Sequence, residues 1–106
     1  MRTIWVNVLL SSIASESASS QEIGNADLGL QYVEEVCSSC HAVHAHQIDS
    51  PVEQATPFQI VADAPGITAN ALTAWLQTSH PTMPNIILID EDMRNVIEYI
   101  LSLKIK

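Results

Sequence analysis

The five residues Cys37-Ser38-Ser39-Cys40-His41 constrain this chain more than any other feature. Two thiols three residues apart are separated by about one helical turn, and an imidazole follows the second thiol directly. This spacing lets the two sulfur atoms form thioethers with the vinyl groups on one edge of a porphyrin, while the histidine nitrogen reaches the iron. The pentapeptide therefore predicts one covalent haem c, attached through Cys37 and Cys40, with His41 as the proximal axial ligand.

Cys37 and Cys40 are the only cysteines in the chain, so other uses of the pair have to be weighed. They could form a disulfide or a Cys-x-x-Cys thiol redox site. Such a redox site usually opens a helix after a strand in a βαβ pattern, and this sequence has no such pattern. A zinc site is the third alternative, because His41, His44, His46 and His80 could supply nitrogen ligands.

Residues 1–20 have the order of a secretory signal peptide. Arg2 supplies the positive charge, residues 3–13 are mostly apolar, and the small, polar residues before position 21 resemble a cleavage region. The apolar stretch is shorter than the ~20 residues that span a bilayer, so we expect no membrane anchor. A fraying N-terminal strand or helix is the alternative. The expected organisation is a leader, 1–20, followed by one domain, 21–106.

A domain as small as residues 21–106, with few aromatic side chains, is only marginally stable unless something crosslinks it. A covalent haem would supply both apolar volume and a crosslink. The chain has twelve acidic and four basic side chains and a formal net charge of −8. This balance disfavours nucleic acid or an anionic membrane surface as a partner.

The pattern of apolar residues predicts an all-α domain without strands. Asn25 is a suitable N-cap for a first helix over 27–37. A short helix over 57–64 begins at a proline in its first position, and Thr68 caps a third helix that extends to about residue 78. A last helix begins at 90, where three acidic residues favour its N-terminal dipole.

The same periodicity predicts which side chains are buried. In the third helix we expect burial of Leu72, Trp75 and Leu76. The last helix carries an apolar stripe of five side chains, Met93, Val96, Ile97, Ile100 and Leu101.

Five side chains compete for the second axial position of the iron. Met83 lies in a loop between two prolines, which hold the backbone extended, and enough chain separates it from His41 to reach the opposite face. His80, in the same loop, is its main rival. Met93 falls on the apolar stripe and is expected to pack in the core. His44 and His46 follow the signature too closely and are expected to be exposed.

The choice between Met83 and His80 determines the redox properties. A thioether is a soft ligand that favours reduced iron, so ligation by His41 and Met83 gives a higher potential than ligation by two histidines. With both axial positions filled by the protein, small molecules have no easy access to the iron, and outer-sphere transfer of one electron remains.

In these residues and their order, the chain resembles the class I cytochromes c, in particular their small monohaem bacterial members. The resemblance covers most of residues 21–106. It rests on Gly29 and Tyr32, the Cys37–His41 signature, Ser50-Pro51, Thr56-Pro57-Phe58, Leu72-Thr73-Ala74-Trp75-Leu76, His80-Pro81-Thr82-Met83-Pro84, Val96 and Tyr99.

The resemblance implies a small cytochrome c fold of about four helices wrapped round one haem, attached through Cys37 and Cys40 and ligated by His41 and Met83. It also implies that the first and last helices cross near Gly29.

In this crossing, the residue expected opposite Gly29 is Tyr99.

The resemblance further implies that a proline carbonyl, assigned to Pro51, accepts the proton of the axial histidine. Phe58, Trp75 and Ile86 are expected to wall the haem.

The expected function is therefore that of a soluble, monomeric, periplasmic electron carrier without enzymatic activity, serving larger redox proteins as electron donor and acceptor. A haem c subunit or domain of a dehydrogenase or oxidase complex is one alternative. A haem sensor whose Met83 dissociates is another. Many family members dock through lysines round the haem edge, and this chain has almost none, so its partner would use an apolar patch or basic groups of its own.

Overall fold

Four helices make up the fold in the computed structural model, which describes residues 2–5, 23–78 and 88–105. They are α1 (Ala26–Val36), α2 (Phe58–Asp63), α3 (Ala69–Leu76) and α4 (Asp90–Ser102). The described residues contain no strand, which confirms the predicted all-α class. None of the described helices is long and apolar enough to cross a membrane.

Two of the helices begin where their capping residues predict. The Oδ1 atom of Asn25 accepts a hydrogen bond of 3.0 Å from the N–H of Leu28, at the start of α1. The hydroxyl of Thr68 accepts one of 3.1 Å from the N–H of Ala71, at the start of α3. Each contact satisfies an N–H that has no partner within its helix. The start of α2 differs by one residue from the prediction, because Pro57 is its N-cap and not its first residue.

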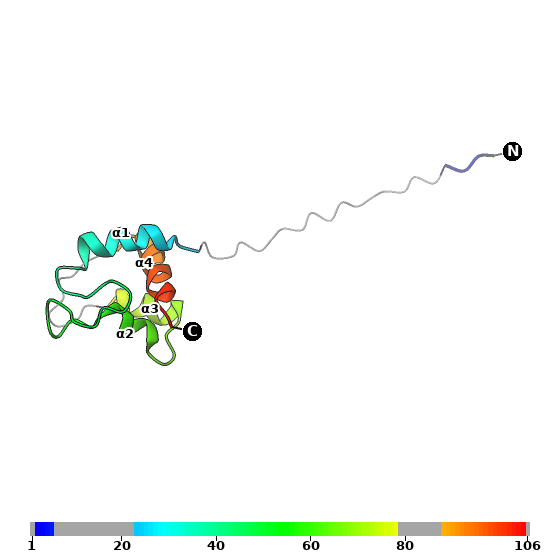
Figure 1. The fold of residues 1–106 in the computed structure, drawn as a ribbon. Helices are drawn as coiled ribbons and strands as arrows, with labels where there is room; N and C mark the ends of the chain where they lie inside the picture. The colour runs from blue at the N-terminus through cyan, green and yellow to red at the C-terminus, as the bar shows by residue number, and fades with distance from the viewer. Residues whose placement is uncertain (1, 6–22, 79–87, 106) are drawn as a thin grey trace.

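The arrangement is centred on α4, which packs against each of the other three described helices (Figure 1). Its buried side chains, Met93, Val96, Ile97, Tyr99 and Ile100, form much of the core. Burial of Met93 confirms that this methionine packs in the core.

The helices α1 and α4 approach each other closely at Gly29. A Cβ atom on this residue would lie 2.0 Å from the carbonyl oxygen of Asn95 and 2.8 Å from the Cβ of Tyr99. Only a residue without a side chain permits this approach, so the expected crossing of the first and last helices near Gly29 and Tyr99 is confirmed. The Oδ1 atom of Asn95 also accepts a hydrogen bond of 2.8 Å from the N–H of Asn25, which ties the start of α1 to α4.

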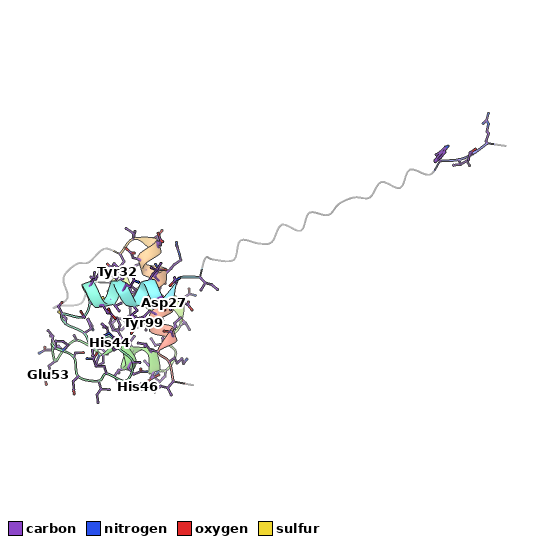
Figure 2. The ribbon with its side chains drawn as sticks, turned by 45° about the horizontal axis from the view of Figure 1, so that its top comes forward. Asp27, Tyr32, His44, His46, Glu53 and Tyr99 are labelled. Carbon is purple, nitrogen blue, oxygen red and sulfur yellow. The ribbon has the colours of Figure 1, made fainter. Side chains whose placement is uncertain are left out.

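A third tie joins α4 to the loop that follows α1. The hydroxyl of Tyr99, which lies below α1 in Figure 2, donates a hydrogen bond to the carbonyl oxygen of Val43. Both residues are buried. The loop after the cysteine–histidine signature is thereby fixed against the α1–α4 pair, and this contact positions the signature.

Candidate haem-binding site

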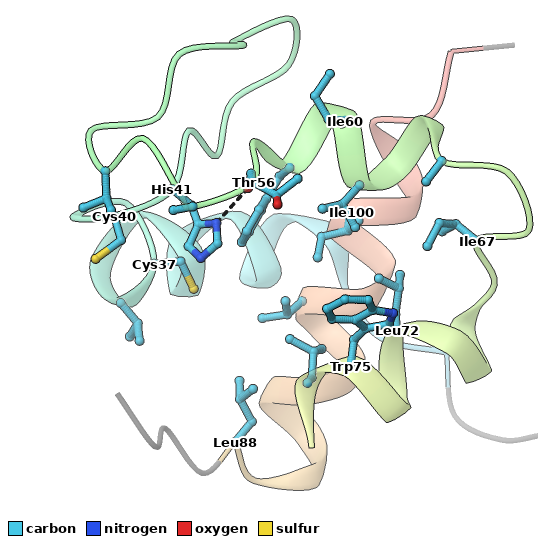
Figure 3. A pocket seen from close by; sticks show the side chains of 18 of the residues that line it. Cys37, Cys40, His41, Thr56, Ile60, Ile67, Leu72, Trp75, Leu88 and Ile100 are labelled. Carbon is cyan, nitrogen blue, oxygen red and sulfur yellow. Dashed lines mark hydrogen bonds between the residues drawn. The ribbon is translucent and has the colours of Figure 1, made fainter. Parts of the chain in front are cut away.

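A cavity of about 800 Å³ lies beside α4, among the end of α1, the signature loop and the helices α2 and α3. Its walls are mostly apolar, and they come from the end of α1, the signature loop, residues 52–58 and all three remaining helices. Figure 3 shows Cys37, Cys40 and His41 at one end of the cavity and Ile67, Leu72 and Trp75 towards the other. The volume falls within the ~300–1,000 Å³ of small-molecule and cofactor sites.

The backbone after α1 brings the two cysteines and the histidine together. Cys37 is the C-cap of α1, and its N–H bonds to the carbonyl oxygen of Val33 at 2.9 Å. The N–H groups of Cys40 and His41 both bond to the carbonyl oxygen of Cys37, at 3.2 and 2.9 Å. These bonds form a tight turn, which places all three side chains on the wall of one cavity, as the spacing predicted.

The orientation of His41 is fixed by one backbone oxygen. Its Nδ1 atom lies 2.7 Å from the carbonyl oxygen of Thr56, to which it donates when Nδ1 carries the proton (Figure 3). In this tautomer, Nε2 has its lone pair available for a metal ion. The ring of Phe58 lies beside the imidazole, with ring centroids 5.2 Å apart and planes tilted by 47°.

The acceptor for His41 is therefore Thr56, and the assignment to Pro51 was wrong. The loop that contains Pro51 does reach the signature, but its bonds go to the neighbours of the histidine. The hydroxyl of Ser50 accepts a hydrogen bond of 2.9 Å from the N–H of Ala42. The N–H of Val52 donates one of 3.1 Å to the carbonyl oxygen of Cys40.

Both candidate carbonyls adjoin a proline, since Pro51 supplies its own and Thr56 precedes Pro57. The sequence signal is therefore similar for the two. The path of the loop decides between them, because the N–H of Phe58 bonds to the carbonyl of Ala42 at 2.8 Å and aligns residues 56–58 with the signature.

Of the three side chains expected to wall the haem, Phe58 and Trp75 line the cavity, and Ile86 is outside the described residues. Trp75 was also expected to be buried, and this was wrong, because its side chain is 62% exposed. It lies at the cavity and not among the core residues. Helical periodicity had identified the inward face of α3, but periodicity does not distinguish a face that meets protein from a face that meets a cavity.

The environment of Cys37 disfavours a thiol redox site. Burial, and to a smaller extent the neighbouring Cys40, raise the pKa of the free Cys37 thiol to about 11. Reactive cysteines in such sites have a lowered pKa, because the thiolate is the nucleophile. The two cysteines also do not form a disulfide with each other.

Among the described residues, His44 and His46 do not assemble a metal site with the cysteines. Both His44 and His46, which are labelled in Figure 2, are exposed, as expected, and they lie outside the cavity lining. The Nε2 atom of His44 lies 3.2 Å from the Oε1 atom of Glu34. Within the described residues, no group of three His, Cys, Asp or Glu side chains could hold a metal ion. The rivals for the second axial position, Met83 and His80, lie outside the described residues.

The arrangement fits a covalent haem on three counts. An apolar cavity of suitable volume surrounds the space in front of His41. The sulfur atoms of Cys37 and Cys40 come from the same wall, and the imidazole already has its Nδ1 atom engaged.

The comparisons with known proteins agree with this geometry. The family model described as Cytochrome c matches residues 26–104, which include all four helices and the Cys37–His41 signature. No curated protein and no solved structure matched the chain. Covalent haem c is the cofactor that this family implies, and Cys37 and Cys40 fit its attachment motif. Sequence, fold and cavity thus lead to one conclusion: the chain belongs to the cytochrome c family.

Proposed function

We propose that this protein is a periplasmic electron carrier that transfers one electron at a time through a single haem c ligated by His41 and Met83. The observation that carries the proposal is the 2.7 Å contact between the Nδ1 atom of His41 and the carbonyl of Thr56, on the wall of an apolar cavity that also holds Cys37 and Cys40. Haem-based electron transfer is the general activity of the family.

In this proposal the bound haem supplies a one-electron couple between ferric and ferrous iron. Cys37 and Cys40 hold the macrocycle through thioethers, and His41 provides a nitrogen ligand from a fixed ring. The Thr56 carbonyl keeps the proton on Nδ1 and increases the basicity of Nε2. The walls of the cavity, which include Phe58, are mostly apolar.

Met83 is the proposed second axial ligand because residues before and after it in the sequence line the cavity. Leu76 and Leu88, which lie on either side of Met83 in the sequence, both line the cavity. Pro81 and Pro84 flank the methionine, and a thioether ligand would raise the potential above that of a pair of histidines.

The visible spectrum of protein matured in a periplasm that contains haem-attachment machinery tests the proposal. We expect a low-spin c-type spectrum, with the weak far-red band of methionine bound to ferric iron. Low-spin haem without that band would transfer the ligand role to His80. Binding of carbon monoxide at neutral pH by the reduced protein would favour a sensor, and a colourless protein would contradict the haem itself.

Substitution of the ligand gives a second test. Met83→Ala should keep the covalent haem, lower the reduction potential and open the iron to added ligands. His80→Ala, in the same loop, is the matched control and should leave the spectrum unchanged. If the two variants behave in the opposite way, His80 is the ligand.

The proposed partners are electron donor and acceptor proteins that use basic groups or an apolar patch of their own. No lysine or arginine lies between Arg2 and Arg94, so the signature and most of the cavity lining come from a stretch without either side chain. Electron transfer to a basic redox protein should become slower as salt is added, since salt screens the attraction. A rate that rises with salt would contradict this choice of partner.

The proposed periplasmic location depends on residues 1–20 acting as a signal peptide. Cell fractionation and N-terminal sequencing test this directly. A full-length chain recovered from the cytoplasm would contradict the location without affecting the assignment of the haem. The same purification tests the monomeric state, because a stable association with a dehydrogenase or oxidase would indicate a subunit of a complex.

A further inference from the structure

The N-terminal end of α2 holds the axial histidine. The Nδ1 atom of His41 lies 2.7 Å from the carbonyl of Thr56, and the N–H of Phe58 bonds to the carbonyl of Ala42 at 2.8 Å. The ring of Phe58 lies beside the imidazole. The position of α2 therefore determines how well the Thr56 carbonyl is aligned with the histidine.

The helix α2 cannot hold this position by itself. It has six residues, and no side chain caps its N-terminus at Pro57. Helices this short are unstable in water unless tertiary contacts hold them. The alignment of the carbonyl must therefore depend on what fixes α2 to the rest of the molecule.

The residue with the most extensive polar contacts on α2 is Gln59, whose side chain is only 4% exposed. Its Oε1 atom accepts a hydrogen bond of 3.0 Å from the N–H of His46. Its Nε2 atom donates to the carbonyl of Leu103 at 2.7 Å and to the Oδ2 atom of Asp63 at 2.9 Å. A buried amide is costly unless it is paired, and here both of its donors and its acceptor have partners.

Two of these three bonds join separate parts of the chain, and the third lies within α2. His46 belongs to the loop after the signature, Leu103 is the C-cap of α4, and Asp63 is the last residue of α2. His46 has a φ of 63°, in the left-handed region that residues other than glycine rarely adopt. Such a conformation persists where surrounding contacts impose it. The N–H of His46 donates to the Gln59 side chain, so the amide of Gln59 links the signature loop, α2 and α4.

We propose that Gln59 is a positioning residue for the axial histidine. By holding α2 between the signature loop and the end of α4, it keeps the Thr56 carbonyl in line with the Nδ1 proton of His41. This bond increases the electron donation of the ring to iron, which stabilises the ferric state. Loosening the bond should therefore raise the reduction potential. The inference rests on the proposed role of His41 as an iron ligand.

Substitution of Gln59 in the haem-loaded protein tests the inference. Gln59→Met has a similar volume and removes all three hydrogen bonds. We expect the ring N–H of His41, followed by NMR in the reduced protein, to exchange with solvent about five- to tenfold faster, as for loss of one ordinary hydrogen bond. We also expect a higher reduction potential.

A matched control separates positioning from general destabilisation. Ile97→Ala removes a buried side chain of α4 that does not line the cavity, so it should lower the unfolding temperature but leave the exchange rate and the potential unchanged. If Gln59→Met behaves like Ile97→Ala in all three measurements, Gln59 has only a structural role and the inference is overturned.

A second variant decides the question if Gln59→Met yields no folded protein. Gln59→Asn keeps the amide but is one methylene shorter, so it cannot reach all three partners at once. It should shift both readouts in the same direction by a smaller amount, and unchanged readouts would overturn the inference. Failure of the proposed function would be seen separately, as a spectrum of the unsubstituted protein that lacks histidine-ligated haem.

Discussion

The two sides of α4 are packed in different ways. Towards α1, protein atoms alone complete the contact, with Gly29 against the carbonyl of Asn95. Towards α2 and α3, Val96 and Ile100 face a cavity of about 800 Å³. The first side is specified by the shapes of residues in the chain, whereas the second is specified by the cofactor that the family binds. Substitutions on the two sides should therefore fail for different reasons.

The largest effect should come from the cavity side. Cys40→Ala removes one of the two thioethers, so we expect impaired maturation, with much of the chain lacking haem and unfolded. The haem content per chain after periplasmic expression measures this. Ser39→Ala, at the exposed position between the two cysteines, is the control and should keep a normal haem content. A normal content in Cys40→Ala would contradict the need for both thioethers.

On the α1 side, we expect Gly29→Ala, which adds a single methyl group, to cause the largest loss of stability. Its Cβ would lie 2.0 Å from the carbonyl oxygen of Asn95, so the two helices must separate. We expect a loss of about 3 kcal/mol in the free energy of unfolding, at the upper end for overpacked sites. Denaturant unfolding of the haem-loaded protein measures it.

The control for this crowding is Gly66→Ala. Gly66 has a φ of 77° and open space where the Cβ would lie, so its substitution tests backbone strain without crowding. We expect a smaller loss, roughly 1–2 kcal/mol, from the left-handed conformation alone. Equal losses at the two glycines would mean that the close helix contact is not the decisive feature.

A smaller effect should follow from Tyr99→Phe. The substitution keeps the ring but removes the hydroxyl that donates to the buried carbonyl of Val43. An unpaired buried carbonyl costs about 1–2 kcal/mol. Because Val43 belongs to the loop after the signature, the loss should appear in the unfolding free energy while the haem content stays normal. An unchanged free energy would show that the hydrogen bond contributes nothing.

The smallest effect should be confined to acid. Asp63 accepts hydrogen bonds from the N–H of Ile105 and the amide of Gln59, in that order of importance, and these lower its pKa from the ordinary 3.8. A carboxylate with a lowered pKa stabilises the fold above its ordinary pKa, and this contribution disappears as the pH falls through the lowered value. Asp63→Asn should therefore weaken the dependence of the unfolding temperature on pH below about 4.

The control for Asp63→Asn is Asp49→Asn, which removes a carboxylate from an exposed loop position. This variant controls for the loss of one negative charge. If the two variants show the same dependence on pH, the contacts of Asp63 to the C-terminal segment have no energetic role.

Local signals made the helices predictable. Asn25 and Thr68 cap the helices that they were expected to cap, because a capping contact reaches only three residues along the chain. The pentapeptide predicted a shared site for Cys37, Cys40 and His41 for the same reason, since one turn of backbone holds all three.

Apart from the crossing of α1 and α4, which the family resemblance implied, contacts between distant segments were not predictable from local signals. The acceptor for His41 was missed because any residue supplies a backbone carbonyl, so no side chain marks Thr56 for the role. The pairing of Asn95 with Asn25 and the buried contacts of Gln59 were missed because polar residues suggest exposure until their partners are known. The signal peptide, the ligand role of Met83 and the haem contact of Ile86 remain predictions. Met83, Ile86 and most of residues 1–20 lie outside the described residues.

The hydrogen bond from His41 to a backbone oxygen has a consequence for how this protein can vary. Replacing Thr56 with another amino acid changes the side chain but leaves the carbonyl in the chain, so point substitution there does not delete the acceptor. Inherited changes in the strength of this hydrogen bond would therefore have to arise from residues that move the backbone. A search for natural variants tuned to different electron donors should look along α2 and its supports, and not at the contact itself.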